Sequence, residues 1–140
     1  MKKLIFLSVL FASFVLIFLP GILAIKIDVE KISENEVLIA DLGQPVTFDL
    51  EIKNNGAPGN FEMYNLAGFS LSPETFSLAS GETKSIALSM TPIGKISQRG
   101  YFSVPVYIRA SDRSEIQQDL TFKIIELKDA FEIGSSDVDP

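Results

Sequence analysis

The chain has 140 residues, the length of one domain with a leader segment. It contains no cysteine and no histidine, which excludes disulfides, histidine-based catalytic triads and zinc sites with nitrogen or sulfur ligands. The net charge is −6, and because an acidic surface repels phosphate backbones we expect no nucleic-acid partner.

A basic start and a long apolar run characterise residues 1–24. Lys2 and Lys3 precede the run, and a Pro-Gly break comes before Ala24, which is the pattern of a secretory signal peptide. The run is also long enough to span a membrane as an uncleaved anchor. We therefore expect an apolar leader helix and a secreted or cell-surface protein. Membrane contact is expected only through this segment, if it stays uncleaved, because the remaining chain has ten basic and 18 acidic residues.

The next two segments differ in how clearly they predict structure. Residues 25–30 alternate between apolar and polar side chains and predict the first strand. Residues 33–40 leave two alternatives, because Ser33 and Glu36 fit a helical capping box whereas the short, partly β-branched run after them favours a strand. We favour a strand that continues the first one.

The clearest strand pattern covers residues 46–53. A β-strand turns successive side chains to opposite faces, so one face of this segment is apolar and the other is polar. The apolar face consists of Val46, Phe48, Leu50 and Ile52. Such a strand needs partner strands and a second layer over its apolar face, and we expect the rest of the chain to be organised around it.

Further alternating segments follow a turn-rich stretch at residues 54–60. They are residues 61–64, 69–73, 76–78, 85–91, 100–108 and 120–124. We expect the aromatic residues Phe61, Tyr64 and Phe69 to lie in the core. Pro105 has no N–H and predicts an unpaired side or a bulge in its strand. Seven or eight short strands with turns roughly every 8–12 residues are typical of an antiparallel sandwich.

Several of these residues together carry a resemblance to a known class of domains. It spans residues 45–124 and rests on Phe48, Leu50, Ile52 and residues 54–56, on residues 76–82, on Ile86, Leu88, Thr91 and Pro92, and on residues 100–102 with Val104. This set resembles the immunoglobulin-like sandwiches of prokaryotic (archaeal and bacterial) surface proteins, and is similar to α-galactosidase-associated, CARDB and Hydin-type (ASH) domains. The resemblance implies a non-catalytic module, often one of several in a multidomain surface protein, and it transfers no catalytic residue.

The chain then divides into three parts. Residues 1–24 are the signal peptide or anchor, residues 25–126 the sandwich, and residues 127–140 an acidic linker or tail that resembles a linker entering another strand or domain. We hypothesise that the chain is the first module of an array or part of a longer protein.

Because cysteine and histidine are absent, carboxylates are the side chains left for acid–base catalysis or metal binding. Asp49 and Glu51 share one strand face about 7 Å apart, within the range that glycosidases use. Any wet strand face produces such pairs, and Lys53 accompanies this one as a counter-charge, so we assign no catalytic residue. Four aspartates carry oxygens suited to Ca²⁺, namely Asp41, Asp112, Asp137 and Asp139. No calcium-loop motif surrounds them, and we predict neither a metal nor another cofactor.

Two tyrosines are the candidate ligand-binding residues. Tyr101 and Tyr107 alternate out of phase with the apolar set of their strand, so both are expected on its outer face. Exposed aromatic rings stack on sugars or pack against a partner protein. The alternative for Tyr101, which follows Gly100 at the strand start, is a structural tyrosine corner.

The sequence therefore predicts an all-β, immunoglobulin-like antiparallel sandwich of about seven strands, preceded by the apolar leader helix. The predicted function is that of a non-catalytic extracellular structural or protein-binding module, for example in adhesion, whose partners are other domains or proteins at the cell surface. The alternative is a carbohydrate-binding accessory domain of a secreted glycan-active enzyme, with glycans as the partner.

Overall fold

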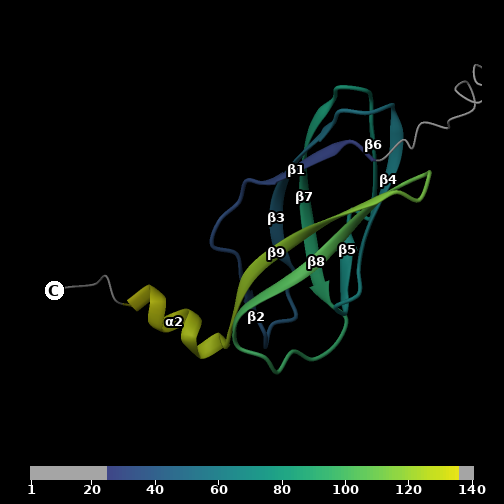
Figure 1. Cartoon of the computed structure of the whole chain (residues 1–140). Helices are drawn as coiled ribbons and strands as arrows, with labels where there is room; N and C mark the ends of the chain where they lie inside the picture. The colour runs from purple at the N-terminus through teal and green to yellow at the C-terminus, as the bar shows by residue number, and fades with distance from the viewer. Residues whose placement is uncertain (1–24, 136–140) are drawn as a thin grey trace, which may run out of the picture.

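The computed structural model describes residues 25–135, which form two β-sheets packed face to face, followed by one helix (Figure 1). The described elements are β1 (Ile27–Lys31), β2 (Val37–Ile39), β3 (Val46–Asn54), β4 (Gly59–Asn65), β5 (Phe69–Ser72), β6 (Thr75–Leu78), β7 (Thr83–Pro92), β8 (Gly100–Ala110), β9 (Glu115–Ile125) and α2 (Leu127–Ser135). The all-β sandwich expected from the alternating patterns is confirmed.

The four-stranded sheet has the strand order β1-β3-β7-β5, and all its pairs are antiparallel. β3 lies inside this sheet between β1 and β7, as its unbroken alternation predicted. Its residues alternate strictly between buried and exposed, and Phe48 and Leu50 lie opposite Leu88 and Ile86 of β7. The apolar faces of both strands therefore point to the same interior.

The five-stranded sheet has the order β2-β9-β8-β4-β6. β8 and β9 form a long hairpin, closed by a hydrogen bond from the Ala110 N–H to the Ser114 carbonyl oxygen at 2.9 Å. β2 is the exception to the antiparallel pattern, since it runs parallel to the end of β9.

The core lies between the two sheets and is dominated by aromatic and branched side chains. The Phe122 ring makes edge-to-face contacts with Phe48, Phe69 and Phe102, with ring centroids 5.8–6.1 Å apart. Edge-to-face contacts are a favourable arrangement for buried rings. Rings from both sheets thus meet at one point of the interior.

Two sequence-based expectations were wrong in detail. The strand within residues 33–40 does not continue β1, because β2 belongs to the opposite sheet and pairs with β9. Ser33 does contact Glu36 through its side chain, but in a loop and not in a helical turn. Residues 127–135 of the expected linker or tail form the helix α2, which the sequence did not predict.

No helix within residues 25–135 is long and apolar enough to cross a membrane. The expected leader at residues 1–24 lies outside the described residues, as do Asp137 and Asp139.

Candidate functional site

The two candidate tyrosines lie on the outer face of the five-stranded sheet. β8 turns Val106 and Ile108 into the core, so the residues between and before them face outward. Tyr101 and Tyr107 therefore share one face, but they are six positions apart, which is about 20 Å along a strand. They belong to two separate surfaces.

Tyr107 stacks on Tyr64 of the neighbouring strand. The ring centroids are 5.2 Å apart, the planes are inclined by 22°, and the two residues are direct cross-strand partners. The expectation that Tyr64 is a core residue was therefore wrong. In β4 the odd-numbered residues Phe61 and Met63 face the core, so Tyr64 faces outward. Strict alternation along the strand would have predicted this outward position.

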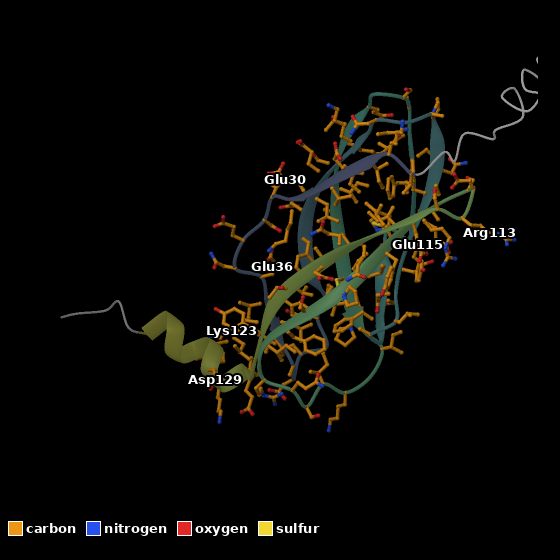
Figure 2. All side chains as sticks on the ribbon, viewed as in Figure 1. Glu30, Glu36, Arg113, Glu115, Lys123 and Asp129 are labelled. Carbon is orange, nitrogen blue, oxygen red and sulfur yellow. The ribbon has the colours of Figure 1, made fainter. Side chains whose placement is uncertain are left out.

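Arg109 and Glu115 complete the tyrosine cluster, and sequence reasoning missed both. The Arg109 guanidinium lies over the Tyr64 ring, 4.4 Å from its centroid, and donates to the Tyr64 hydroxyl at 2.6 Å. That hydroxyl donates in turn to Glu115 at 2.7 Å. The bond from Tyr64 is the main reason why the pKa of Glu115 is lowered, and the same bond raises the pKa of Tyr64. Figure 2 shows Glu115 beside the hairpin that carries Arg113.

The hydrogen-bonding groups of this cluster are already bonded to one another. One face of the Tyr107 ring lies against Tyr64, and the polar atoms of Tyr64, Arg109 and Glu115 bond to one another. A planar ligand at this cluster would contact the ring edges and the ion pair between Arg109 and Glu115. Only part of the aromatic surface of Tyr64 and Tyr107 is free to stack on such a ligand.

Tyr101 is the most exposed ring on this face, with 80% of its surface accessible. It is the second residue of β8 and lies directly opposite Lys123 of β9. A tyrosine corner would pack the ring against the fold, so the exposure of Tyr101 contradicts that alternative. A free phenol ring beside a lysine can contact a partner surface or the face of a sugar.

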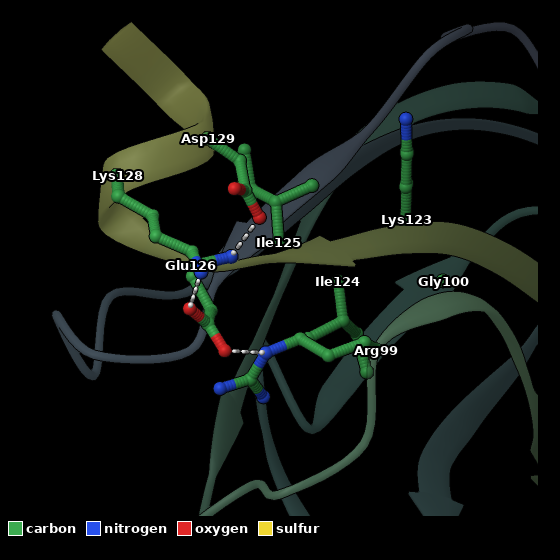
Figure 3. A pocket seen from close by; sticks show the side chains of 8 residues that line it. All are labelled: Arg99, Gly100, Lys123, Ile124, Ile125, Glu126, Lys128 and Asp129. Atoms are coloured by element: carbon green, nitrogen blue, oxygen red, sulfur yellow. Dashed lines mark hydrogen bonds and ion pairs between the residues drawn. The ribbon is translucent and has the colours of Figure 1, made fainter. Parts of the chain in front are cut away.

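A hollow lies where α2 leaves the sandwich (Figure 3). It has a volume of about 490 Å³ and is lined mainly by Arg99, Lys123, Glu126, Lys128 and Asp129 with the ends of β8 and β9. Glu126 accepts from Arg99 and Lys128, each at 3.1 Å. Bonding to Lys128, and then to Arg99, lowers the pKa of Glu126. The charges of this hollow are thus largely paired with each other.

A second hollow of about 370 Å³ lies at the opposite end of the sandwich. The loop after β3 and the β8–β9 hairpin line it. Asn54 is the one polar residue that is buried as a whole among the described residues, and its side chain bonds to the loop carbonyls of Ala57 and Ala79. Asp112 accepts from the Ser114 N–H and hydroxyl, which lowers its pKa. These groups hold the loops together.

The structure places the candidate carboxylates Asp49 and Glu51 on one exposed face and Asp41 and Asp112 elsewhere. Asp49 and Glu51 lie on the outer face of the four-stranded sheet, exposed, with Glu30 of β1 opposite Glu51. Asp41 accepts from the Leu127 N–H at 3.1 Å. Across residues 25–135, no group of three or more acidic residues is arranged to hold a metal ion.

No protein-family model matches the sequence, and no curated protein matches it significantly. Solved structures do resemble it. The FixG-related protein from Vibrio parahaemolyticus has a TM-score of 0.54 and 15% identity over 71% of this chain and 94% of its own. The E. coli chaperone DraB has a TM-score of 0.50 and 12% identity over 74% of this chain and 56% of its own. The ASH/PapD-like domain 7 of human CEP192 has a TM-score of 0.46 and 17% identity over 74% and 87%.

At these identities the likeness concerns the fold alone. Together with the two sheets described above, it shows that the chain contains an immunoglobulin-like β-sandwich fold. The α-galactosidase-associated, CARDB and Hydin-type families stay predictions from the sequence.

Proposed function

We propose that the chain is a non-catalytic module that works outside the cytoplasm, as a rigid structural or protein-binding unit of a secreted or cell-surface protein. The leader pattern of residues 1–24 supports export. The core is filled by the chain's own side chains, and across residues 25–135 no group of three or more acidic residues is arranged to hold a metal ion. The residues thus support presentation of a surface better than they support catalysis.

One observation carries the structural role. The start of β1 lies beside the β8–β9 hairpin, since Ile25 and Ser111 line the same hollow. β9 runs away from that hairpin for eleven residues and ends where α2 begins. The two ends of the described chain therefore lie at opposite poles, about 36 Å apart along the strand (Figure 1). A module with this geometry keeps segments attached at its two poles apart and in line.

Paired labels can test this geometry. Because the chain has no cysteine, Lys26→Cys and Lys128→Cys introduce two unique labelling sites at the two poles. Spin labels on them should give one narrow distance distribution centred near 35–40 Å. A broad or short distribution would contradict a rigid in-line module. Protease treatment of intact cells that produce the full chain tests export, and a chain protected by the membrane would overturn the extracytoplasmic role.

Glycan binding is the second candidate, and the exposed ring of Tyr101 favours it. A sugar-binding accessory module would bind polysaccharide in a pull-down and lose that binding in Tyr101→Ala. Tyr107→Ala should have the smaller effect, because Tyr64 already covers one face of the ring. No binding to any polysaccharide, or equal binding by both variants and the unchanged chain, would reject this candidate.

A further inference from the structure

Half of β8 lacks a neighbour on one side. β4 pairs with β8 only from Val106 to Ala110, yet β8 continues to Gly100. After Asn65 the chain leaves this sheet and forms β5 in the other sheet. Residues 100–105 therefore pair with β9 on one side and with no described strand on the other. We call this segment the open edge.

The register shows which backbone groups the open edge offers. The Ala110 N–H bonds to Ser114, so even-numbered residues of β8 point their N–H and C=O toward β9. The pairing with β9 is continuous without a bulge, so the N–H and C=O groups of the odd-numbered residues point away from β9. Tyr101 and Ser103 thus direct an N–H and a C=O into the open side, and Pro105 directs a C=O there.

Pro105 is well suited to this position. Its missing N–H lies on the side that has no partner strand, so the fold loses no ladder bond, as the sequence predicted. No backbone hydrogen bond from elsewhere in residues 25–135 engages Tyr101 or Ser103 on that side. On Tyr101 and Ser103 the open edge consequently has two free donors and two free acceptors.

Apolar surface accompanies the open edge. Phe102 is only half-buried, whereas Val104, the next inward residue of the open edge, is fully buried. Leu66, directly after the end of β4, is 81% exposed, and Ile93 is 74% exposed. The two loops that carry them are joined by the Ile93 N–H and the Gly68 carbonyl oxygen at 2.9 Å.

The positive charge near the open edge comes from lysines. Residues 92–110 contain Lys95, Arg99 and Arg109 and no acidic residue, but Arg99 is paired with Glu126 and Arg109 with Glu115, so Lys95 is the cation of this described stretch without an ion-pair partner. Residues 65–72 contain no charged side chain at all. Lys123 lies across from Tyr101 on the outer face. An acidic partner is therefore attracted here and a basic one is repelled.

We propose that the open edge binds an extended acidic segment of a partner protein, which adds to β8 as a strand in the place that β4 vacates. The proposal rests on the proposed function as a protein-binding module. Backbone bonds to Tyr101 and Ser103 hold the segment. Alternate apolar side chains cover Phe102, and the acidic side chains between them lie on the outer face near Lys123.

The other long unpaired stretch is less suited to this role. β2 pairs only with residues 123–125 of β9, so residues 115–121 also lack a neighbour. That stretch carries outward Glu115 and Asp119, and charged side chains are a common protection of sheet edges against added strands. It serves as an internal control.

Binding of a labelled peptide to the full chain tests the proposal. The probe is a seven-residue peptide of alternating Asp and Val, and fluorescence anisotropy reports its dissociation constant. We expect binding that weakens with added salt. The matched Lys-Val peptide should bind at least about tenfold more weakly.

Two proline variants locate the site. Ser103→Pro removes a free donor and blocks the open edge, and should weaken binding at least about tenfold. Gln117→Pro places the same change on the unpaired stretch of β9, and should leave binding unchanged. If Ser103→Pro does not fold, modified peptides replace it as the test on the unchanged chain. N-methylation of the peptide amides that face β8 should abolish binding, whereas N-methylation of the intervening amides should leave binding unchanged.

Absent binding of the Asp-Val peptide, equal binding by Ser103→Pro, or a loss confined to Gln117→Pro would overturn the open edge as the site. If the chain passes the spin-label and export tests but does not bind the peptide, only this inference is refuted. A chain that fails those tests refutes the proposed function itself.

Discussion

The Lys31 ammonium lies 2.6 Å from a carboxylate oxygen of Glu36, and this ion pair joins the two sheets. Lys31 ends β1 in the four-stranded sheet, and Glu36 directly precedes β2 in the five-stranded sheet. Ser33 donates to the other carboxylate oxygen, and the Glu36 side chain is only 5% exposed. The Glu36 carbonyl also accepts from the Lys123 N–H at 2.9 Å. Glu36 thus anchors the segment that crosses between the sheets.

Stability should depend on pH through Glu36. Burial acts to raise its pKa, but hydrogen bonds from Lys31 and Ser33 outweigh burial, and the pKa lies below its usual value of 4.5. The stabilisation is therefore complete above 4.5 and is lost as the pH falls through the lowered pKa. We expect Glu36→Gln to reduce the unfolding free energy by about 1–3 kcal/mol near neutral pH. Urea denaturation should show this difference shrinking in acid, and a constant difference would contradict the role of the charge.

Asn54 should be the polar side chain on which stability depends most. It donates to the carbonyls of Ala57 at 2.8 Å and Ala79 at 3.1 Å, and it accepts from the Gly56 N–H at 2.9 Å. Asn54→Ala leaves these groups unpaired and should cost about 2–3 kcal/mol, with an unchanged denaturant slope. Asn55→Ala is the matched control, since Asn55 is exposed, and should cost less than about 1 kcal/mol. Equal effects of the two substitutions would show that burial of Asn54 is unimportant.

Removal of the Phe122 ring should destabilise the core more than loss of any of the polar contacts above. The side chain is 1% exposed and contacts three other rings from both sheets. We expect Phe122→Ala to cost about 3–5 kcal/mol in urea or thermal unfolding. Phe131→Ala removes an equal ring from α2, where it is 72% exposed, and should change stability by less than about 0.5 kcal/mol. A large effect of Phe131→Ala would mean that α2 packs against something in solution.

Gly100 should resist substitution for a conformational reason alone. Its φ is 90°, which side chains rarely adopt, and an added Cβ would meet no atom within 4 Å. Gly100→Ala should cost about 1–2 kcal/mol. Gly94→Ala, in the loop that leads to β8 and with equally open space, should be nearly neutral because no such φ is required there. Equal melting temperatures for the two variants would reject backbone strain as the cause.

The local pattern was sufficient for the strands but not for their partners. Alternation in residues 46–53 and 100–108 predicted which side chains face the core, and the buried sets of β3 and β8 confirm it. It also predicted the unpaired side at Pro105. The helical segment α2 was missed, because nine residues after a strand-rich chain contain too few turns for a clear helical period. The functional roles of Tyr101 and Tyr107 stay predictions.

The sequence by itself determined that this chain forms an all-β sandwich, because two-residue alternation requires only neighbouring residues on one strand. Only the tertiary structure decided that β2 joins the opposite sheet, that Tyr64 pairs with Tyr107, and that β8 has an open edge. Pairing brings together segments far apart along the chain, and several registers bury the same apolar faces. The packing of both sheets around one core selects among them, and that selection leaves no local trace in the order of the residues.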